Sequence, residues 1–298
     1  MKIASYRYAH QLSYGIVVGQ SIVDAGAELR SRYPDLKALL DAGALHELQQ
    51  RNNLLCDLSQ DDVSFLPVVP NPGKIFCVGM NHQQKRQEFD EHDPAPTLFV
   101  RFADSQTGHL QPVIKPRYSQ QFDYEGELAV VIGRGGYQIS EQNALSHVVG
   151  YSCYMDGSAR DWQHAWFTAG KNWRCTGAFG PWLVTTDEIP YPHTLTLTTK
   201  LNGRQVQQDN TAHMIHRIPE LIRYISTFSE LKPGDVIITG SPGGVGKKRN
   251  PPLFLQPGDE IEVAISQIGC LRNQVTDDEL PLSVSSTAAQ ESVGSIAC

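Results

Sequence analysis

Short runs of apolar and β-branched residues, each bounded by turn residues, recur along most of the chain. Because Val, Ile, Thr and Tyr fit a pleated sheet, these runs predict strands rather than helices. The predicted strands cover residues 75–80, 97–102, 127–133, 148–155, 194–201, 236–240 and 260–265. The Asn202-Gly203 pair predicts a two-residue hairpin turn, because both residues accept positive φ angles. The pattern indicates a mostly β (α+β) fold.

The beginning of the chain combines both periodicities. Two short strand-like runs lie at residues 2–8 and 12–19. Over residues 36–48 apolar residues recur three and four apart, which is the spacing of one helix face. We therefore expect a small N-terminal α+β domain over residues 1–70.

A proline-rich stretch, residues 65–73, ends this first unit, because its prolines and glycine disfavour a helix. The main domain is expected over residues 71–280. Its best helix is predicted over 213–231, with an interruption at Pro219. Residues 281–298 are small and polar, which predicts a flexible C-terminal tail.

Composition narrows the class of protein. The 298 residues include 25 Lys and Arg against 32 Asp and Glu, a net charge of −7, which argues against a nucleic-acid partner. The apolar runs are strand-sized, whereas a membrane-spanning helix needs roughly 20 apolar residues. The six cysteines lack metal-ligand spacing and are predicted to be reduced thiols. We expect a cytoplasmic protein that acts on a small molecule, with no nucleic acid and no membrane.

Three carboxylates stand out as a candidate metal site. Glu125 and Glu127 lie two apart at the opening of a predicted strand, so their side chains share one face. Asp156 ends another predicted strand, where it turns into a loop. An all-oxygen set favours Mg²⁺, Mn²⁺ or Ca²⁺ over zinc. The alternative is a solvated outer face, on which such pairs are common.

Two glycine-containing segments are candidates for ligand binding. Lys171 lies in a loop rich in glycine and aromatic residues, where a desolvated amine would bind an oxyanion, although most lysines lie on the surface. The segment 239–248 fails the phosphate-loop spacing, because Ser241 stands where the motif needs glycine. We interpret it as a tight loop whose backbone amides approach a ligand.

Several segments form an ordered set of motifs. They are Phe76 to Asn81, Glu125 to Gly133, Asp156 to Gln163, Gly170-Lys171 with Gly180-Pro181-Trp182, and Leu231 to Pro242. In this order they resemble the fumarylacetoacetate hydrolase superfamily over roughly residues 74–275, and its acylpyruvate hydrolases and 2-hydroxyhepta-2,4-diene-1,7-dioate isomerases in particular. Each motif is moderately specific, and their common order is highly so.

The resemblance implies a mixed β-sandwich roll, usually a homodimer, that acts on 2-oxo acids with a second carbonyl group. It implies that Mg²⁺ or Mn²⁺, with Ca²⁺ as a further option, is bound by Glu125, Glu127 and Asp156. The residues implied to hold the substrate's oxygens are Arg160, Gln163, Lys171 and Ser241. Chelation of the 2-oxo-carboxylate unit stabilises an enolate at carbon 3, which serves hydrolysis, decarboxylation and tautomerisation alike.

One position departs from the family. Glu88 falls where the family's lid carries a glutamate, but the position three residues before it is Lys85, where hydrolytic members carry the histidine that helps to activate water. His82 stands where the family usually has tyrosine. Three interpretations follow: Lys85 is desolvated and acts as a base, His82 substitutes for it, or the water step is absent. A further alternative is an exposed Lys85–Glu88 ion pair.

Three functional hypotheses follow, with Lys171, Glu88, Lys85 and His82 as the candidate catalytic residues. The first is a metal-dependent hydrolase that cleaves a carbon–carbon bond of acylpyruvate-type acids, as in aromatic-compound catabolism. The second is a decarboxylase or keto–enol isomerase acting on unsaturated 2-oxo diacids, which the lysine at position 85 favours. The third is a non-catalytic relative that binds a metal and an oxo acid.

Overall fold

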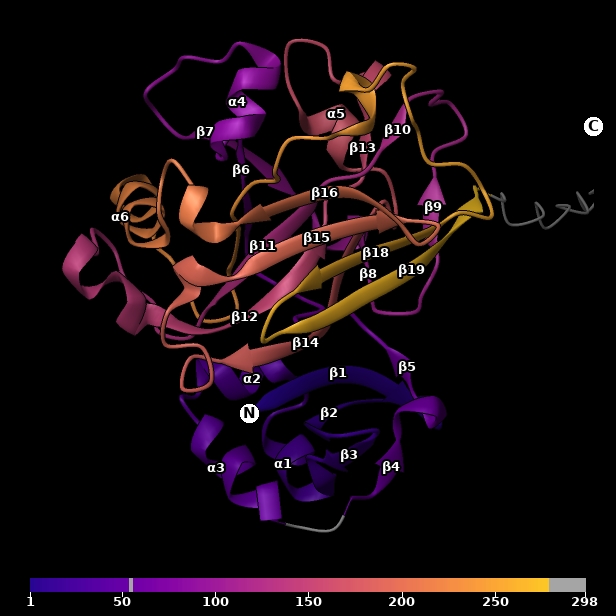
Figure 1. Ribbon diagram of the computed structural model, residues 1–298. Helices are drawn as coiled ribbons and strands as arrows, with labels where there is room; N and C mark the ends of the chain where they lie inside the picture. Colours follow the sequence, from indigo (N-terminus) through magenta and orange to yellow (C-terminus); the bar gives the residue numbers. More distant parts are fainter. Residues whose placement is uncertain (54–55, 279–298) are drawn as a thin grey trace, which may run out of the picture.

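Strands dominate the computed structural model, which describes residues 1–53 and 56–278 (Figure 1). Its large sheet has the order β4-β3-β2-β1-β14-β12-β11-β17-β6-β7, with β5 added beside β1 and β8 beside β14. The strands of this sheet are β1 (Lys2–Tyr8), β2 (Gln11–Val18), β3 (Ser21–Asp24), β4 (Leu58–Ser59), β5 (Ser64–Phe65), β6 (Ile75–Gly79), β7 (Thr97–Arg101), β8 (Gln106–Thr107), β11 (Gly126–Ile132), β12 (Val148–Met155), β14 (Gly177–Thr185) and β17 (Val236–Ile238).

A second sheet, with the order β16-β15-β18-β19-β9, packs against one face of the large sheet. Its strands are β9 (Val113–Lys115), β15 (Thr196–Leu201), β16 (Arg204–Asn210), β18 (Glu260–Ile265) and β19 (Gly269–Asp277). A short pair consists of β10 (Phe122–Asp123) and β13 (Ser158–Ala159). The helices are α1 (Gly26–Arg32), α2 (Leu36–Asp41), α3 (Leu45–Gln49), α4 (Gln83–Phe89), α5 (Thr168–Lys171) and α6 (Ile218–Phe228). The predicted mostly β sandwich is confirmed.

Strand β11 lies inside the large sheet and is buried along its whole length. Because side chains alternate along a strand, its residues divide between two cores. Leu128 and Val130 pack in the core between the two sheets. Ala129 and Val131 pack in the core that also contains Leu39 of the N-terminal helices. The strand that carries the candidate metal residues is therefore held from both faces.

The N-terminal segment joins the rest of the molecule through hydrogen bonds as well as packing, because β1 pairs antiparallel with β14. The prediction of one continuous helix over residues 36–48 is wrong. The segment is divided into α2 and α3, because Gly43 adopts a φ of 64°, which ends a right-handed helix. The division of the chain at residue 70 stays a prediction.

Two further elements differ from the predictions. The helix predicted over 213–231 begins only at Ile218, so Pro219 lies in its first turn, where the missing N–H and fixed φ of proline are tolerated. Strand β14 was not predicted, because Gly180 and Pro181 lie inside it. Its pairing with β12 shifts register here, and this irregularity accommodates the two residues.

The predicted strands are confirmed, with the predicted bounds over 2–8, 148–155 and 260–265 and with shorter or shifted ends elsewhere. The hairpin at Asn202-Gly203 has the expected positive φ angles of 51° and 76°. The predicted flexible tail, 281–298, lies outside the described residues. Within residues 1–53 and 56–278, no helix is long and apolar enough to cross a membrane.

Candidate functional site

The pairing of β11 with β12 brings the three candidate metal residues together. Gly126 pairs with Met155, so Glu125 and Asp156, which flank these residues, are neighbours. The backbone N–H of Asp156 donates a 2.8 Å hydrogen bond to the carbonyl of Glu125. One carboxylate oxygen from each of Glu125, Glu127 and Asp156 lies within 4.8 Å of the others, and all three side chains are buried. The solvated-face alternative is wrong for these residues.

Gly126 keeps the two glutamates in this position, because the second sheet leaves no room for a side chain there. A Cβ at Gly126 would lie 2.1 Å from Oγ1 of Thr199 and 3.2 Å from Val263. We expect Gly126→Ala to push β11 away from β15, lowering the free energy of unfolding by about 1–3 kcal/mol. Urea denaturation measures this change. Unchanged stability would contradict the tight packing of the sheets at this point.

Positively charged groups surround the carboxylates. The Lys171 ammonium, at the end of α5, donates to Glu125 Oε2 at 2.5 Å and also to Asp156. Lys85, on α4, donates to Glu125 Oε1 at 2.6 Å. Arg101, at the end of β7, donates to the other oxygen of Asp156. Glu125 and Asp156 are thus each paired with two or more cations.

Glu127 is different, because in the described structure it has no cationic hydrogen-bonding partner. Its carboxylate accepts one hydrogen bond, from the backbone N–H of Gly240 at 2.6 Å. Burial, together with the charges of Asp156 and Glu125, raises the pKa of Glu127 well above its usual range. For Glu125 burial acts in the same direction, but the charges of Arg160 and the two lysines outweigh it and lower its pKa. Among the described residues, Glu127 is thus the carboxylate of the cluster that no cationic side chain pairs with, and a divalent cation fits beside it.

Two of the candidate substrate residues, Arg160 and Gln163, have a buried donor without a hydrogen-bonding partner among the described residues. Arg160 donates from Nε to Asp123 Oδ2 at 2.9 Å, and its Nη2 lies 3.0 Å from Glu125 Oε1 without hydrogen-bond alignment. The side-chain nitrogen of Gln163 is also buried without a hydrogen-bonding partner among the described residues. Ser241 contacts both Glu125 and Lys85, at 3.3 and 3.2 Å. Arg160 and Gln163 thus offer donors that a ligand's oxygens would satisfy.

Sequence reasoning missed two residues of this network. Asp123 is fully buried, binds Arg160, and accepts hydrogen bonds from the backbone N–H groups of Gly246 and Lys247 at 2.7 and 3.0 Å. The sequence feature that could have pointed to Asp123 is its position, two residues before Glu125 in an extended segment. For Arg101 the feature is that it is a single charged residue in an otherwise apolar run.

Lys85, at the family's lid position, is buried. It lies on helix α4, the lid helix, in the connection between β6 and β7 (Figure 1). Lys85 is 2 % exposed, and burial lowers its pKa although Glu125 opposes the shift. The exposed Lys85–Glu88 ion pair is therefore wrong. Glu88 instead accepts from the backbone N–H of Gly244 at 2.6 Å, and its second oxygen is buried without a partner among the described residues.

His82 does not point into the acidic cluster. Its Nδ1 lies 2.8 Å from Asp209 on β16, and His213 contacts the other oxygen of the same carboxylate. Although burial opposes the shift, the hydrogen bonds from the two histidines lower the pKa of Asp209 to about 2. His82 immediately precedes α4, so it anchors the start of the lid helix.

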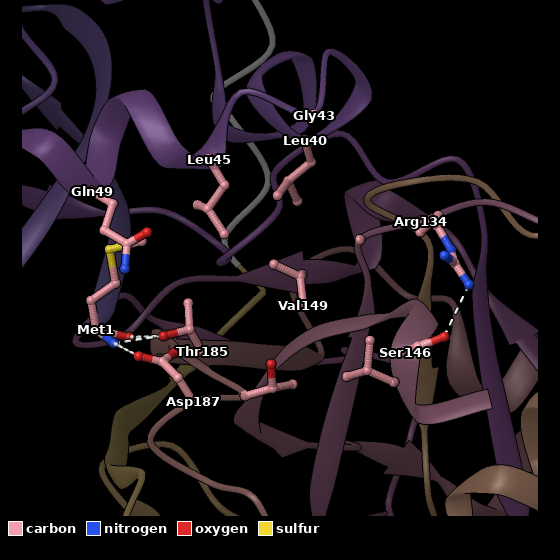
Figure 2. A pocket seen from close by; sticks show the side chains of 13 residues that line it. Met1, Leu40, Gly43, Leu45, Gln49, Arg134, Ser146, Val149, Thr185 and Asp187 are labelled. Atoms are coloured by element: carbon pink, nitrogen blue, oxygen red, sulfur yellow. Dashed lines mark hydrogen bonds and ion pairs between the residues drawn. The ribbon is translucent and has the colours of Figure 1, made fainter. Parts of the chain in front are cut away.

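The cavity above the acidic cluster is small, about 20 Å³, and is lined by residues of both the sheet and the lid. Its lining residues are Val78, Gly79, Met80, Lys85, Phe99, Glu125, Glu127, Asp156, Arg160, Phe167, Lys171 and Ser241. A larger pocket of about 330 Å³ lies elsewhere, between the N-terminal helices and the large sheet (Figure 2). Leu40, Leu45 and Val149 face this pocket, and none of the cluster's carboxylates lines it. The chemistry is therefore concentrated at the smaller cavity.

Comparison with known proteins agrees with this geometry. Residues 74–276 match the model of the fumarylacetoacetate (FAA) hydrolase C-terminal family. The chain belongs to the fumarylacetoacetate hydrolase family. Among curated family members, the human protein named oxaloacetate tautomerase FAHD2A, mitochondrial, is 41% identical over 225 residues, covering 73% of this chain and 71% of that protein.

Solved structures of the family have the same fold over nearly the whole chain. Fumarylacetoacetate hydrolase from Exiguobacterium antarcticum is 32% identical with a TM-score of 0.78, covering 93% of this chain and 99% of that one. Maleylpyruvate hydrolase from Sphingobium sp. SYK-6 is 26% identical with a TM-score of 0.80, covering 93% and 100%. A second structure of that hydrolase, in complex with manganese(II) and pyruvate, has the same fold: it is 24% identical with a TM-score of 0.77, covering 94% of this chain and 100% of that one.

Proposed function

We propose that this chain is a divalent-metal-dependent enzyme that interconverts keto and enol forms of 2-oxo acids through an enolate at carbon 3. The observation that carries the proposal is the buried carboxylate cluster: among the described residues Glu127 has no cationic partner, and donors of Arg160 and Gln163 have no hydrogen-bonding partner. Isomerisation is favoured over hydrolysis because Lys85, at the position of the hydrolytic histidine, is held by Glu125. The tautomerase name of the human relative also supports it.

Glu125, Glu127 and Asp156 would hold Mg²⁺ or Mn²⁺, since hard cations prefer carboxylate oxygens. When bound, the cation supplies the positive charge that makes the carbon-3 proton of a chelated 2-oxo acid more acidic. The same charge removes the reason for the raised pKa of Glu127, so this residue would bind as a carboxylate.

Residues beside the cluster would orient the substrate. Nη2 of Arg160 and the side-chain nitrogen of Gln163 would contribute donors that are buried without a hydrogen-bonding partner among the described residues, and Lys171 would contribute an ammonium group beside two of the metal carboxylates. Charged donors in a water-poor site hold carboxylate and enolate oxygens strongly. The lid helix would exclude water from the enolate, which is what an isomerase needs and a hydrolase does not.

Glu88 is our candidate for moving the proton of carbon 3. It lies one helical turn after Lys85, its Oε1 is fixed by Gly244, and its Oε2 is buried without a partner among the described residues. We expect Glu88→Gln to slow exchange of the carbon-3 protons of pyruvate in D₂O by about 100-fold, the scale of general acid–base catalysis, with metal affinity unchanged. Proton NMR measures the exchange. Glu91→Gln, just beyond the helix, is the control; equal rates for Glu88→Gln and this control would refute the role.

Carbon–carbon bond hydrolysis is the second candidate function. The observation that favours it is the likeness to maleylpyruvate hydrolase, which extends over the whole of that chain. Mass analysis after incubation with Mg²⁺ and either oxaloacetate or acetylpyruvate separates the candidates. Carbon-3 exchange without fragmentation supports the tautomerase. Formation of pyruvate and acetate from acetylpyruvate would show a hydrolase instead. Release of carbon dioxide from oxaloacetate would show a decarboxylase instead. Metal binding without any of these outcomes would indicate the non-catalytic relative.

The assembly and cellular location expected from the sequence stay predictions. We propose a homodimer on the basis of the family resemblance, and light scattering of the purified protein tests it. Cytoplasmic location is also a prediction, whereas the human relative is named as mitochondrial.

A further inference from the structure

Strand β16 contacts both the lid helix and the strand that carries the two glutamates of the cluster. Its residues Gln207 and Asp209 are two apart, so their side chains share one face of the strand. Gln207 is buried, and its Oε1 accepts a 3.0 Å hydrogen bond from the backbone N–H of Gly126, which separates the two glutamates. Asp209 Oδ2 lies 2.8 Å from Nδ1 of His82, the residue before α4. One face of β16 therefore fixes β11 and the start of the lid helix relative to each other.

The contact between Asp209 and His82 has a defined direction. Although burial opposes the shift, hydrogen bonds from His82 and His213 lower the pKa of Asp209 to about 2, so its carboxylate is ionised at neutral pH. The backbone N–H of Asn210 also donates to this carboxylate, at 2.8 Å. Because an ionised carboxylate only accepts hydrogen bonds, Nδ1 of His82 carries a proton and is the donor. The contact is thus a charge-assisted hydrogen bond.

The ring of His82 depends on this hydrogen bond. His82 is 1 % exposed, and its Nε2 is buried without a partner among the described residues. Without Asp209 both ring nitrogens would be buried and unpaired, which is costly. The ring would then turn toward water, and the start of α4 would move with it, because the carbonyl of His82 accepts the first hydrogen bond of this helix, from Arg86 at 3.0 Å.

A movement of the helix start would reach the functional end of the lid. Lys85 and Glu88 follow His82 by three and six residues on a helix of seven residues. Lys85 is held by Glu125 and Glu88 by the backbone N–H of Gly244, each at 2.6 Å. These short contacts require one position of α4 relative to the sheet. A small displacement of the reacting groups lowers the rate strongly.

We propose that Asp209 is a positioning residue for the proposed reaction, in which it holds α4 through His82 so that Glu88 reaches carbon 3 of the substrate. The inference rests on the proposed function, which gives Glu88 the transfer of the carbon-3 proton. Asp209 is not among the residues that line the cavity above the cluster, so its effect passes through the lid helix. Its removal should slow proton transfer and leave metal binding unchanged.

Two variants of Asp209 test the proposal. We expect Asp209→Leu to slow exchange of the carbon-3 protons of pyruvate in D₂O at least about tenfold, the scale of one charge-assisted hydrogen bond, with Mg²⁺ affinity unchanged. Asp209→Asn should give an intermediate rate, because its side-chain oxygen still accepts from Nδ1 of His82 without the charge. Unmodified exchange rates in Asp209→Leu would overturn the inference and leave the enzyme assignment intact.

A local readout separates positioning of the lid from general support of the fold. Hydrogen exchange of backbone amides, followed by mass spectrometry, should become faster over Gln83–Phe89 in Asp209→Leu and stay unchanged over Gly126–Ile132. Faster exchange in both segments would show general destabilisation and overturn the specific role. The matched control is His213→Gln, because His213 contacts the other oxygen of the same carboxylate and its side chain is 57 % exposed. Equal slowing of carbon-3 exchange by this control and by Asp209→Leu would also overturn the role.

A double-mutant cycle tests the route through His82. If Asp209 acts through this residue, Asp209→Leu should have no further effect on carbon-3 exchange in a His82→Phe protein. Equal slowing in both backgrounds would overturn the route.

One measurement needs no variant. Nitrogen-15 NMR of the His82 ring in the unmodified protein should show a protonated Nδ1, and an unprotonated Nδ1 would overturn the inference even if the variants fail to fold. Absence of carbon-3 exchange in the unmodified protein would instead overturn the proposed function. Amide exchange of α4 would in that case still report whether Asp209 holds the lid helix.

Discussion

Replacing Glu127 with glutamine is expected to lower Mg²⁺ affinity by at least about 100-fold and turnover by about 1,000-fold, because the site loses a ligand and its charge. The same change should leave the metal-free protein as stable as before or more stable. Glutamine resembles a protonated glutamate in shape, and the raised pKa of Glu127 indicates that the buried carboxyl group resists ionisation. Loss of metal binding is thus expected without loss of folding.

The sign of the stability effect follows from proton linkage. The pKa of Glu127 is raised in the folded protein. Without metal, its protonated side chain therefore contributes fully to the stability at pH values below the usual glutamate pKa. That contribution is lost as pH rises through the raised pKa. Glutamine does not titrate, so Glu127→Gln removes this dependence.

Two measurements check the prediction for Glu127. Titration calorimetry reports Mg²⁺ affinity, and thermal unfolding with and without Mg²⁺ reports stability. Glu230→Gln, an exposed glutamate beyond α6, is the control and should retain both metal affinity and stabilisation by metal. Unchanged Mg²⁺ affinity in Glu127→Gln would show that the cation binds elsewhere.

Replacing Lys171 with methionine should have the opposite effect on metal binding while also lowering turnover. The ammonium of Lys171 contacts Glu125 and Asp156, so its charge competes with a cation for both carboxylates. Its removal should raise Mg²⁺ affinity by about tenfold or more, given the strength of charge interactions at such distances. Turnover should fall by about 1,000-fold, because the substrate loses a charged donor.

The metal-free Lys171→Met protein should be less stable, by about 3–5 kcal/mol, because two buried carboxylates lose a common partner. Saturating Mg²⁺ should restore much of this loss, which thermal unfolding measures directly. Lys200→Met, at an exposed position of β15, controls for loss of a lysine on the surface. Weaker Mg²⁺ binding by Lys171→Met would mean that Lys171 supports the metal site rather than competing with it.

The placements that the sequence predicts correctly follow from local rules. Strand periodicity places Glu125 and Glu127 on one face, and the end of a strand-like run locates Asp156. The pairing of β11 with β12 then brings them together, and sequential neighbours in the chain often pair in this way. The Asn202-Gly203 turn is local in the same sense.

The features that sequence reasoning misses depend on distant segments. Arg101 and Asp156 are 55 residues apart, and Lys85 and Glu125 are 40 apart, so no short-range pattern connects them. For this reason the sequence leaves four interpretations of Lys85 open. The break in the N-terminal helix depended on the backbone of a single glycine, Gly43. Strand β14 was not predicted because it contains a proline, which a register shift in its pairing with β12 accommodates.

The carboxylates of the cavity and the residues of the lid helix are held in the fold to different degrees. The carboxylates lie at the ends of β11 and β12, which are inner strands of the large sheet and buried in its cores. Lys85 and Glu88 lie on a helix of seven residues between two loops. We therefore expect substitutions in this helix to alter the proposed chemistry without unfolding the strands that carry the carboxylates. A fold built in this way could acquire a new reaction by exchanging a few residues of α4, and under the proposed function the lysine at position 85 would be such an exchange.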